Sequence, residues 1–236
     1  MEKKTKRISF LASLTNRCNI LYDCGCDHGL VIKEALENNY IKYAIASDVN
    51  EAPLNSAKKN LCNYIGRVSF YHGNGICCNY DNVDCILLAG MGGNLILEII
   101  SKYLDSYNVN KLKDTKFIIQ ANSKAFELRV QLGELGFHIS DEYIIFDKGQ
   151  FYEIVVCHFV GIKNDTYKRE YYSKILLKKL EDDLKGGLNS DIVLYFNEQF
   201  RYINELNSKI DLKNKSKILF KKLVILNNIL ENNDME

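Results

Sequence analysis

A short stretch near the start of the chain, DCGCDHG at residues 23–29, could support two kinds of chemistry. Its two cysteines and its histidine stand at alternate positions and could bind a metal ion. Its acids and spaced glycines could instead hold a nucleotide, because glycine lets the backbone approach a ligand closely. The two interpretations predict different proteins.

The metal interpretation needs a third and a fourth ligand at a compatible spacing. The other Cys and His residues near this stretch form no recognised pairing with Cys24 and Cys26: Cys18, Cys62, His72, Cys77 and Cys78. We therefore expect no metal. The stretch is better interpreted as a cofactor loop in which the carboxylates and glycines act and the cysteines fill space.

The elements that must position this loop alternate regularly. From residue 19 to 160, short apolar runs rich in Ile, Val and Tyr are each followed by a longer amphipathic stretch, which is typical of a parallel α/β sheet. We expect strands at 20–24, 43–47, 67–71, 85–89 and 116–120, and helices at 28–39, 53–64, 93–104 and 124–135. The only proline, Pro53, would lie in the first turn of its helix, where proline is tolerated.

The end of this region follows a different pattern. Residues 137–160 hold two strand-like runs separated by the turn Asp147-Lys148-Gly149, with no room for a helix between them. Five parallel steps closed by an antiparallel hairpin form the Rossmann-like sheet of class I methyltransferases. A dinucleotide dehydrogenase would normally continue with a sixth parallel strand. We therefore expect an α/β methyltransferase domain over residues 1–161.

Residues 162–236 have helical rather than strand spacing, with a break at Gly186-Gly187 and another expected within 207–216. We expect two or three antiparallel helices that form a coiled-coil-like appendage. Residues 163–230 hold fourteen Lys or Arg against nine Asp or Glu. This excess fits either an ordinary solvated helical face or a surface for phosphate backbones.

Composition sets the broad class. The chain has 236 residues, 47% hydrophobic and 26% charged, with a formal charge of +1, as in ordinary globular proteins. Its longest apolar run, residues 85–100, is interrupted by glycines and carries Glu98, so we expect no membrane span. No signal peptide is apparent, and most of the eight cysteines lie in apolar runs. We expect a cytoplasmic monomer with reduced, buried thiols.

Acids and amides recur where the expected strands end. Asp48 follows the second strand about 25 residues after Asp23, where a carboxylate can accept the hydroxyls of a ribose. It could alternatively cap the following helix. Asn74, between Gly73 and Gly75, could pair with an adenine edge or belong to a plain Asn-Gly turn.

The fourth and fifth strand ends extend this pattern. The run LLAGMGGN at 87–94 has more glycines than helix–strand packing needs, so we expect a ligand close to the backbone there. Gln120 and Asn122 present amides at the same edge. In the hairpin, residues 151–153 could line the site or belong to the core.

These motifs, in this order across residues 6–160, resemble the bacterial tRNA adenine-N1 methyltransferases that modify position 22, the TrmK type. The matching elements are the helix from Lys6-Arg7-Ile8, D-x-G-x-D-H at 23–28, the acid and proline at Asp48 and Pro53, G-x-G at 73–75, A-G-M-G-G at 89–93, Q-x-N at 120–122 and Y-E-I at 152–154. Three departures stand out. Asn74 replaces an Asp, Ala121 replaces a Pro, and Cys24 and Cys26 replace small or aliphatic residues.

The resemblance implies S-adenosylmethionine as cofactor and tRNA as partner and substrate. The cofactor-binding residues expected are Asp23, Gly25, Asp27, His28, Asp48, Val49, Gly73, Asn74, Gly75, Ala89, Gly90 and Met91. The substrate-binding residues expected are Arg7, Gly92, Gln120 and Tyr152. Asp27 and Asn122 are the expected base-positioning, catalytic residues, and His28 could either contact the cofactor or open the helix.

Adenine N1 has a free lone pair, so no proton must be removed before it attacks a methyl group, and proximity does most of the work. Two alternatives stay open. One is a methyltransferase acting on another nucleobase position, a small molecule or a protein. It is disfavoured because AGMGG stands where amino-directed methylases place an Asn-Pro-Pro-Tyr tetrapeptide. The other is a non-catalytic RNA-binding module of the same fold.

Overall fold

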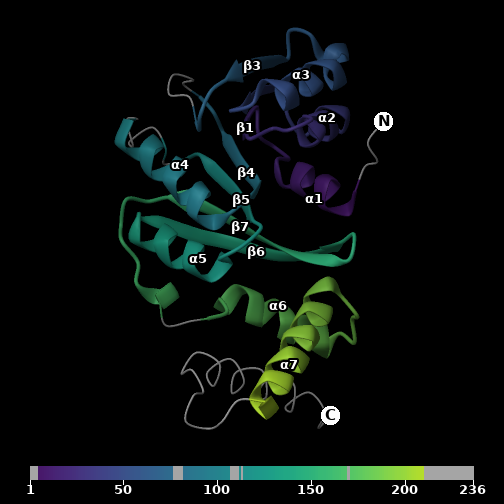
Figure 1. Cartoon of the computed structure of the whole chain (residues 1–236), viewed down its shortest axis with the longest axis vertical. Coiled ribbons are helices and arrows are strands. Elements are labelled where there is room, and N and C mark those ends of the chain that lie inside the picture. Colours follow the sequence, from purple (N-terminus) through teal and green to yellow (C-terminus); the bar gives the residue numbers. More distant parts are fainter. Residues whose placement is uncertain (1–4, 77–81, 107–111, 113, 169–170, 210–236) are drawn as a thin grey trace.

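A seven-stranded sheet forms the centre of the molecule (Figure 1). The computed structural model describes residues 5–76, 82–106, 112, 114–168 and 171–209. The strand order is β3-β2-β1-β4-β5-β7-β6. The strands are β1 (Ile20–Cys24), β2 (Tyr43–Asp48), β3 (Val68–His72), β4 (Cys85–Met91), β5 (Lys116–Ala121), β6 (Phe137–Asp147) and β7 (Gln150–Phe159).

The pairing confirms the expected sheet. β1 to β5 run parallel, and β7 pairs antiparallel with both β5 and β6. The parallel strands β1, β2, β4 and β5 are largely buried, so they read as near-continuous apolar runs, for example CILL at the start of β4. The carboxyl ends of β1, β2, β4 and β5 therefore meet at one edge of the sheet, where ligands of open α/β folds bind.

Helices cover both faces of the sheet. On one face, α1 (Lys6–Leu14), α2 (Leu30–Glu37) and α3 (Glu51–Asn60) pack on a core that includes Leu21 and Leu87. On the other, α4 (Gly93–Ser106) and α5 (Ala125–Glu134) pack on a core that includes Tyr22 and Leu88. The alternation of neighbouring residues between the two cores follows from the period of two along a strand.

The helix after the first strand begins two residues later than its apolar pattern predicts. We expected His28 to start it, but α2 starts at Leu30, and Gly29 before it has a φ of +68°. That left-handed conformation favours glycine and cannot continue a right-handed helix. His28 therefore belongs to the loop, which corrects the helix-opening alternative.

The regular secondary structure that is described after residue 161 is helical. The helices α6 (Lys174–Lys185) and α7 (Asp191–Lys209) form a third core with Ile144 of β6 (Figure 1). The expected break within 207–216 and any further helix lie largely outside the described residues, so the coiled-coil character of this part stays a prediction. No helix in the described ranges is long and apolar enough to cross a membrane.

The carboxylate of Asp191 joins the start of α1 and the start of α7 to the β6–β7 hairpin. Asp191 Oδ2, at the start of α7, accepts hydrogen bonds from Lys6 Nζ (2.5 Å) and from the backbone N–H of Phe146 (2.9 Å). Nearby, the backbone N–H of Arg7 donates to Asp147 Oδ2 (3.1 Å). The start of α1 and the start of α7 therefore meet at the tip of the β6–β7 hairpin.

The cysteines only partly follow the expectation. Cys18, Cys24, Cys26, Cys85 and Cys157 are free and buried, but Cys62 is exposed. Cys62 lies in a short 3-10 turn that follows α3 rather than inside the helix expected over 53–64. The other two, Cys77 and Cys78, lie outside the described residues.

Candidate functional site

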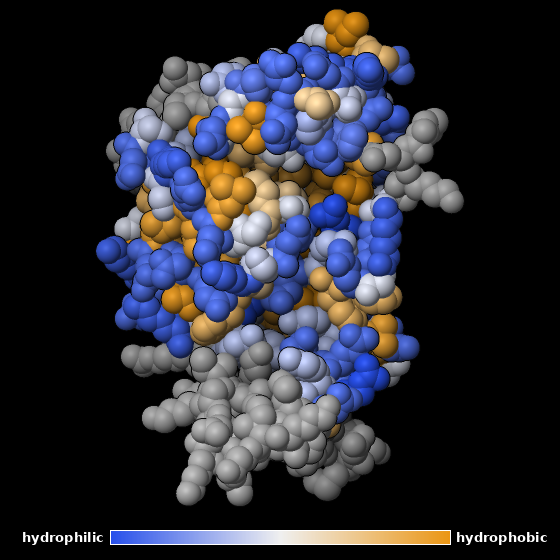
Figure 2. Space-filling model, viewed as in Figure 1, coloured by the Kyte–Doolittle hydropathy of each residue, from blue (hydrophilic) through white to orange (hydrophobic). Residues whose placement is uncertain are grey.

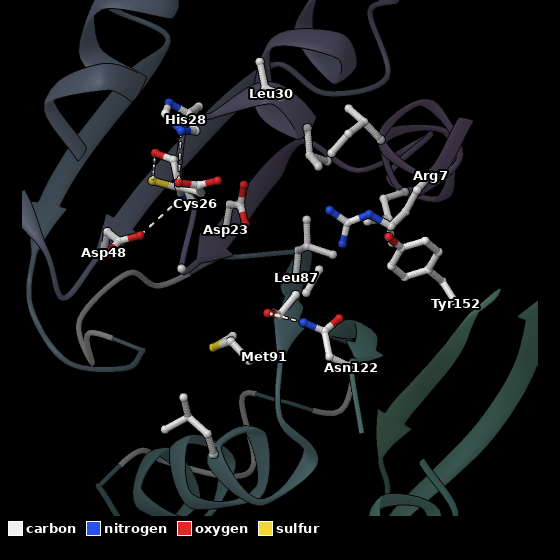
Figure 3. Close-up of a pocket in the computed structure, with 18 of the residues that line it drawn as sticks. Arg7, Asp23, Cys26, His28, Leu30, Asp48, Leu87, Met91, Asn122 and Tyr152 are labelled. Atoms are coloured by element: carbon white, nitrogen blue, oxygen red, sulfur yellow. Dashed lines mark hydrogen bonds and ion pairs between the residues drawn. The ribbon is translucent and has the colours of Figure 1, made fainter. Parts of the chain in front are cut away.

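A cavity of about 470 Å³ opens at the carboxyl edge of the sheet. Residues from α1, the β1–α2 loop, the ends of β2 and β4, the β5–α5 loop and the start of β7 line it (Figure 3). Figure 2 shows hydrophobic side chains gathered in the recess between the α2–α3 part and the α4–α5 part of the molecule. We call the side of the cavity that carries Asp23, Asp27 and Asp48 the acidic wall. The apolar lining residues, such as Leu87 and Met91, form what we call the apolar floor.

The β1–α2 loop is held open by its neighbour strand. The backbone N–H groups of Gly25 and Cys26 donate to Ser47 O of β2 at 2.8 and 2.9 Å. Gly25 has a φ of +76°, and a side chain there would point at Met91, 3.5 Å away. That distance is an ordinary van der Waals contact, so this position favours glycine because of its left-handed backbone conformation rather than for lack of space. No side chain caps α2, so its first N–H groups remain available to an anion.

Asp23 carries the most perturbed carboxyl group of the cavity. It ends β1, it is only 4% exposed, and Asp48 and Asp27 lie close by. Burial, reinforced by the charges of Asp48 and Asp27, raises the pKa of Asp23 to about 7. The charged groups that shift this pKa are all acidic in the described part of the chain, and such surroundings favour a positively charged ligand group.

Asp48 lies across the loop from Asp23 (Figure 3). Its carboxylate accepts the backbone N–H of Asp27 (3.2 Å) and that of Asn50 (2.9 Å). The second contact lies at the N-cap of α3, so Asp48 supports that helix start while it lines the cavity. Each carboxylate oxygen keeps a second lone pair for a ligand.

Cys26 shares this wall but lacks metal or nucleophile chemistry. Burial and the three neighbouring carboxylates raise the pKa of its thiol, so the sulfur stays protonated. Across the described residues, no group of three or more His, Cys, Asp or Glu side chains could hold a metal ion.

The opposite wall is a hydrogen-bonded ring around Gly90. Gln120 Oε1 accepts from Arg7 Nη1 (2.7 Å) and from the Gly90 N–H (3.2 Å), and Gln120 Nε2 donates to Asn122 Oδ1 (3.0 Å). Asn122 Nδ2 in turn donates to Gly90 O (2.7 Å). Gln120 is 0% exposed and holds Arg7 and Asn122 in this ring, and its contact with a substrate stays a prediction.

Arg7 and Tyr152 complete this wall. The Arg7 guanidinium lies over the Tyr152 ring, 4.8 Å from its centroid, and both side chains face the cavity (Figure 3). Gly90, with a φ of +81°, sits at a register shift of β4 that turns its peptide toward Gln120. This wall offers a cation, an amide and an aromatic ring at one place.

The two glycines after Met91 differ in their need for space, which gives a stability prediction. A Cβ at Gly93 would meet Ser123 O at 2.9 Å, whereas one at Gly92 would meet only Ser123 Oγ at 3.5 Å. We expect Gly93→Ala to lower the free energy of unfolding by about 1–3 kcal/mol because backbone must shift. Gly92→Ala is the matched control and should cost less than about 1 kcal/mol. Urea unfolding of both variants measures the difference, and equal costs would contradict it.

Most of the expected site residues come together in the cavity. Those that line it are Arg7, Asp23, Gly25, Asp27, His28, Asp48, Val49, Ala89, Gly90, Met91, Asn122 and Tyr152. The residues Gly73, Asn74 and Gly75 follow the edge strand β3 and are not among the residues that line the cavity. The Gly73 N–H donates to the backbone oxygen of Asp48, which does line it (3.0 Å). Their contact with a cofactor stays a prediction, as does that of Gly92 with a substrate.

Several lining residues were not predicted. They are Ile8, Leu11, Cys26, Leu30, Val31, Asn50, Leu87, Leu95 and Gln150. Apart from Cys26 and Leu87, the apolar ones belong to helices whose patterns show only that one face is buried, and not what covers it. Gln150 could have been found, because it is two residues before Tyr152 and so shares its face of the strand.

The strand order and the strand-end cavity define a class I methyltransferase fold. The family model described as "Methyltransferase domain" matches residues 4–155, and the chain belongs to this family. A tRNA (adenine(22)-N(1))-methyltransferase of Bacillus subtilis is 28% identical over 168 residues, which cover 70% of this chain and 68% of that relative.

Solved structures extend this similarity over the full chain. A Streptococcus pneumoniae protein assigned as a tRNA (m1A22) methyltransferase superposes with a TM-score of 0.77 at 27% identity, over 97% of this chain and 100% of its own. The same protein in complex with S-adenosyl-L-methionine superposes with a TM-score of 0.75 at 27% identity, with the same coverage of both chains.

Proposed function

We propose that this protein is a methyltransferase that uses S-adenosylmethionine to methylate N1 of adenine 22 in tRNA. The observation that carries the proposal is a single cavity that joins the acidic β1–α2 loop to the Arg7–Gln120–Asn122 wall. The relatives named for this reaction support the same assignment. The substrate would place the protein in the cytoplasm.

The residues of the acidic wall fit the chemistry of the cofactor. Asp23 would receive its ammonium group, the free N–H groups of α2 its carboxylate, and Asp48 its ribose hydroxyls. Bound there, S-adenosylmethionine supplies an electrophilic methyl group. The Met91 side chain and the apolar floor exclude water from this part of the cavity.

The opposite wall fits the acceptor base. Asn122 lies at the mouth of the cavity, and the ring through Gln120 fixes its amide. A fixed amide oriented in this way would hold the adenine edge so that N1 faces the donor, which is the main requirement of the reaction. N1 methylation makes the base cationic, and the exposed carboxylate of Asp27 at the rim would stabilise that charge.

The decisive experiment is methylation of unmodified tRNA by the full chain, followed by nucleoside analysis. We expect 1-methyladenosine from tRNA with adenine at position 22, and none when that adenine is replaced by guanine. A different methylated nucleoside would point to another nucleobase specificity. Failure to bind S-adenosylmethionine in calorimetry would instead indicate an RNA-binding module without activity, and either result would overturn the proposal.

A further inference from the structure

A second cavity of about 470 Å³ lies beside the first and shares a strand with it. Along β7, Gln150 and Tyr152 line the first cavity, whereas Phe151 and Glu153 line the second. Successive side chains of a strand point to opposite faces, so one strand forms a wall of both cavities.

The β5–α5 loop is a second shared wall. Asn122 lines the first cavity and Lys124, two residues later, lines the second. Lys124 has a φ of +59°, a left-handed conformation that is uncommon outside glycine. If one unit of a linear polymer lies beside Asn122 in the first cavity, the next unit of that polymer is therefore within reach of Lys124 in the second.

The second cavity is rich in aromatic side chains. Phe126 stacks on Tyr171 with ring centroids 4.8 Å apart and an interplanar angle of 17°, and Phe151 meets Tyr195 edge-on at 5.4 Å. Gln199, which carries an amide, also lines the cavity. Rings with a polar group beside them are how proteins hold single, unstacked bases.

The charged side chains of the second cavity favour a nucleobase over a free anion in its interior. Arg129, which is buried, lies 3.2 Å from a Glu142 oxygen and 3.4 Å from a Glu153 oxygen, so two carboxylates balance its charge. Glu153 also accepts a hydrogen bond from Tyr195 (2.9 Å). The interior therefore disfavours phosphate, while the exposed Lys124 at the rim favours it. A nucleotide whose base lies inside the cavity and whose phosphate lies beside Lys124 at the rim fits the charges of both places.

We propose that this second cavity binds an unstacked nucleobase of the tRNA, adjacent in the chain to the adenine that is methylated. The inference rests on the proposed function and adds to it a second base-binding site. That site would hold the tRNA strand on both sides of β7 and fix which nucleotide enters the first cavity.

The test uses the full chain with the double substitution Phe126→Leu and Lys124→Gln, which keeps apolar volume and side-chain length but removes the stacking ring and the charge. We expect the KM for tRNA to rise roughly 5- to 100-fold, the loss typical of one stacked base. The Kd for S-adenosylmethionine should stay unchanged, which also verifies folding. Tyr43→Ala is the matched control, because Tyr43 is 51% exposed at the amino end of β2, on the opposite edge of the sheet.

A second measurement uses tRNA with an abasic nucleotide on one side or the other of the target. One of the two should weaken the wild type as much as the double substitution does, and it should weaken the double variant no further. An unchanged KM, or losses that add fully, would overturn the second site. If the wild type makes no 1-methyladenosine, the proposed function fails instead, and equilibrium binding of the same RNAs still decides the cavity.

Discussion

Asp23→Asn is expected to weaken S-adenosylmethionine binding by roughly 10- to 150-fold, the value of a hydrogen bond to a charged group in a buried site. The same substitution should stabilise the protein without cofactor at neutral and alkaline pH, because it removes a carboxylate that is buried beside two others. Loss of binding together with a gain in stability is a combination that simple damage to the fold does not produce.

The sign of the pH dependence follows from the pKa of Asp23. It is about 7 in the folded protein and about 3.8 in the unfolded chain, so the folded state holds the proton more tightly. The contribution of Asp23 to stability is therefore full below pH 4 and is lost as the pH rises through 7. The free energy of unfolding of the Asn variant should exceed that of the wild type by an amount that grows between pH 4 and pH 7. Above pH 7 the difference should level off at on the order of 2–4 kcal/mol.

Urea unfolding at pH 5 and pH 8, with calorimetric titration of S-adenosylmethionine, measures both effects. Asp105→Asn is the control, because Asp105 is exposed near the end of α4, lies outside the cavity and should change stability little at either pH. Near pH 7, cofactor binding to the wild type should release protons, and binding to the Asn variant should release fewer. An Asn variant that binds normally, or that is less stable at pH 8, would contradict the role given to Asp23.

Gln120→Leu is expected to have the second large effect. The substitution removes the side-chain acceptor of the Gly90 N–H and separates Arg7 from its partner at 2.7 Å. We expect a loss of about 1–3 kcal/mol in the free energy of unfolding, since both part-buried hydrogen bonds that Gln120 Oε1 accepts are lost. Methyl transfer should fall about 100-fold in kcat, because Asn122 is no longer held in place.

Gln120→Glu separates the two effects. A glutamate keeps the acceptor for Arg7 and Gly90 but cannot donate to Asn122. It should recover most of the stability while kcat stays low, with the Kd for S-adenosylmethionine close to that of the wild type. Equal activity in the Glu variant and the wild type would indicate that the amide of Asn122 needs no support from Gln120.

The sheet and the acidic loop could be predicted because their signals are local. Apolar runs of strand length and glycines at strand ends gave β1, β2, β4 and β5 nearly to the residue. Gln120 could not be placed, because a polar residue at a strand end reads the same whether it faces a ligand or supports its neighbours. The start of α2 was missed because the effect of Gly29 depends on its left-handed conformation, which the apolar pattern does not report.

The meeting of Lys6, Phe146 and Asp191 has a consequence for protein engineering. Exchanging the C-terminal helices for ones without an acid at the position of Asp191 would leave both the start of α1 and the hairpin tip without their shared acceptor. Since Arg7 follows Lys6 directly, such a graft would also disturb the wall of the cavity that Arg7 helps to form. A chimaera of this kind should carry its own hairpin tip and first helix together with the transplanted helices.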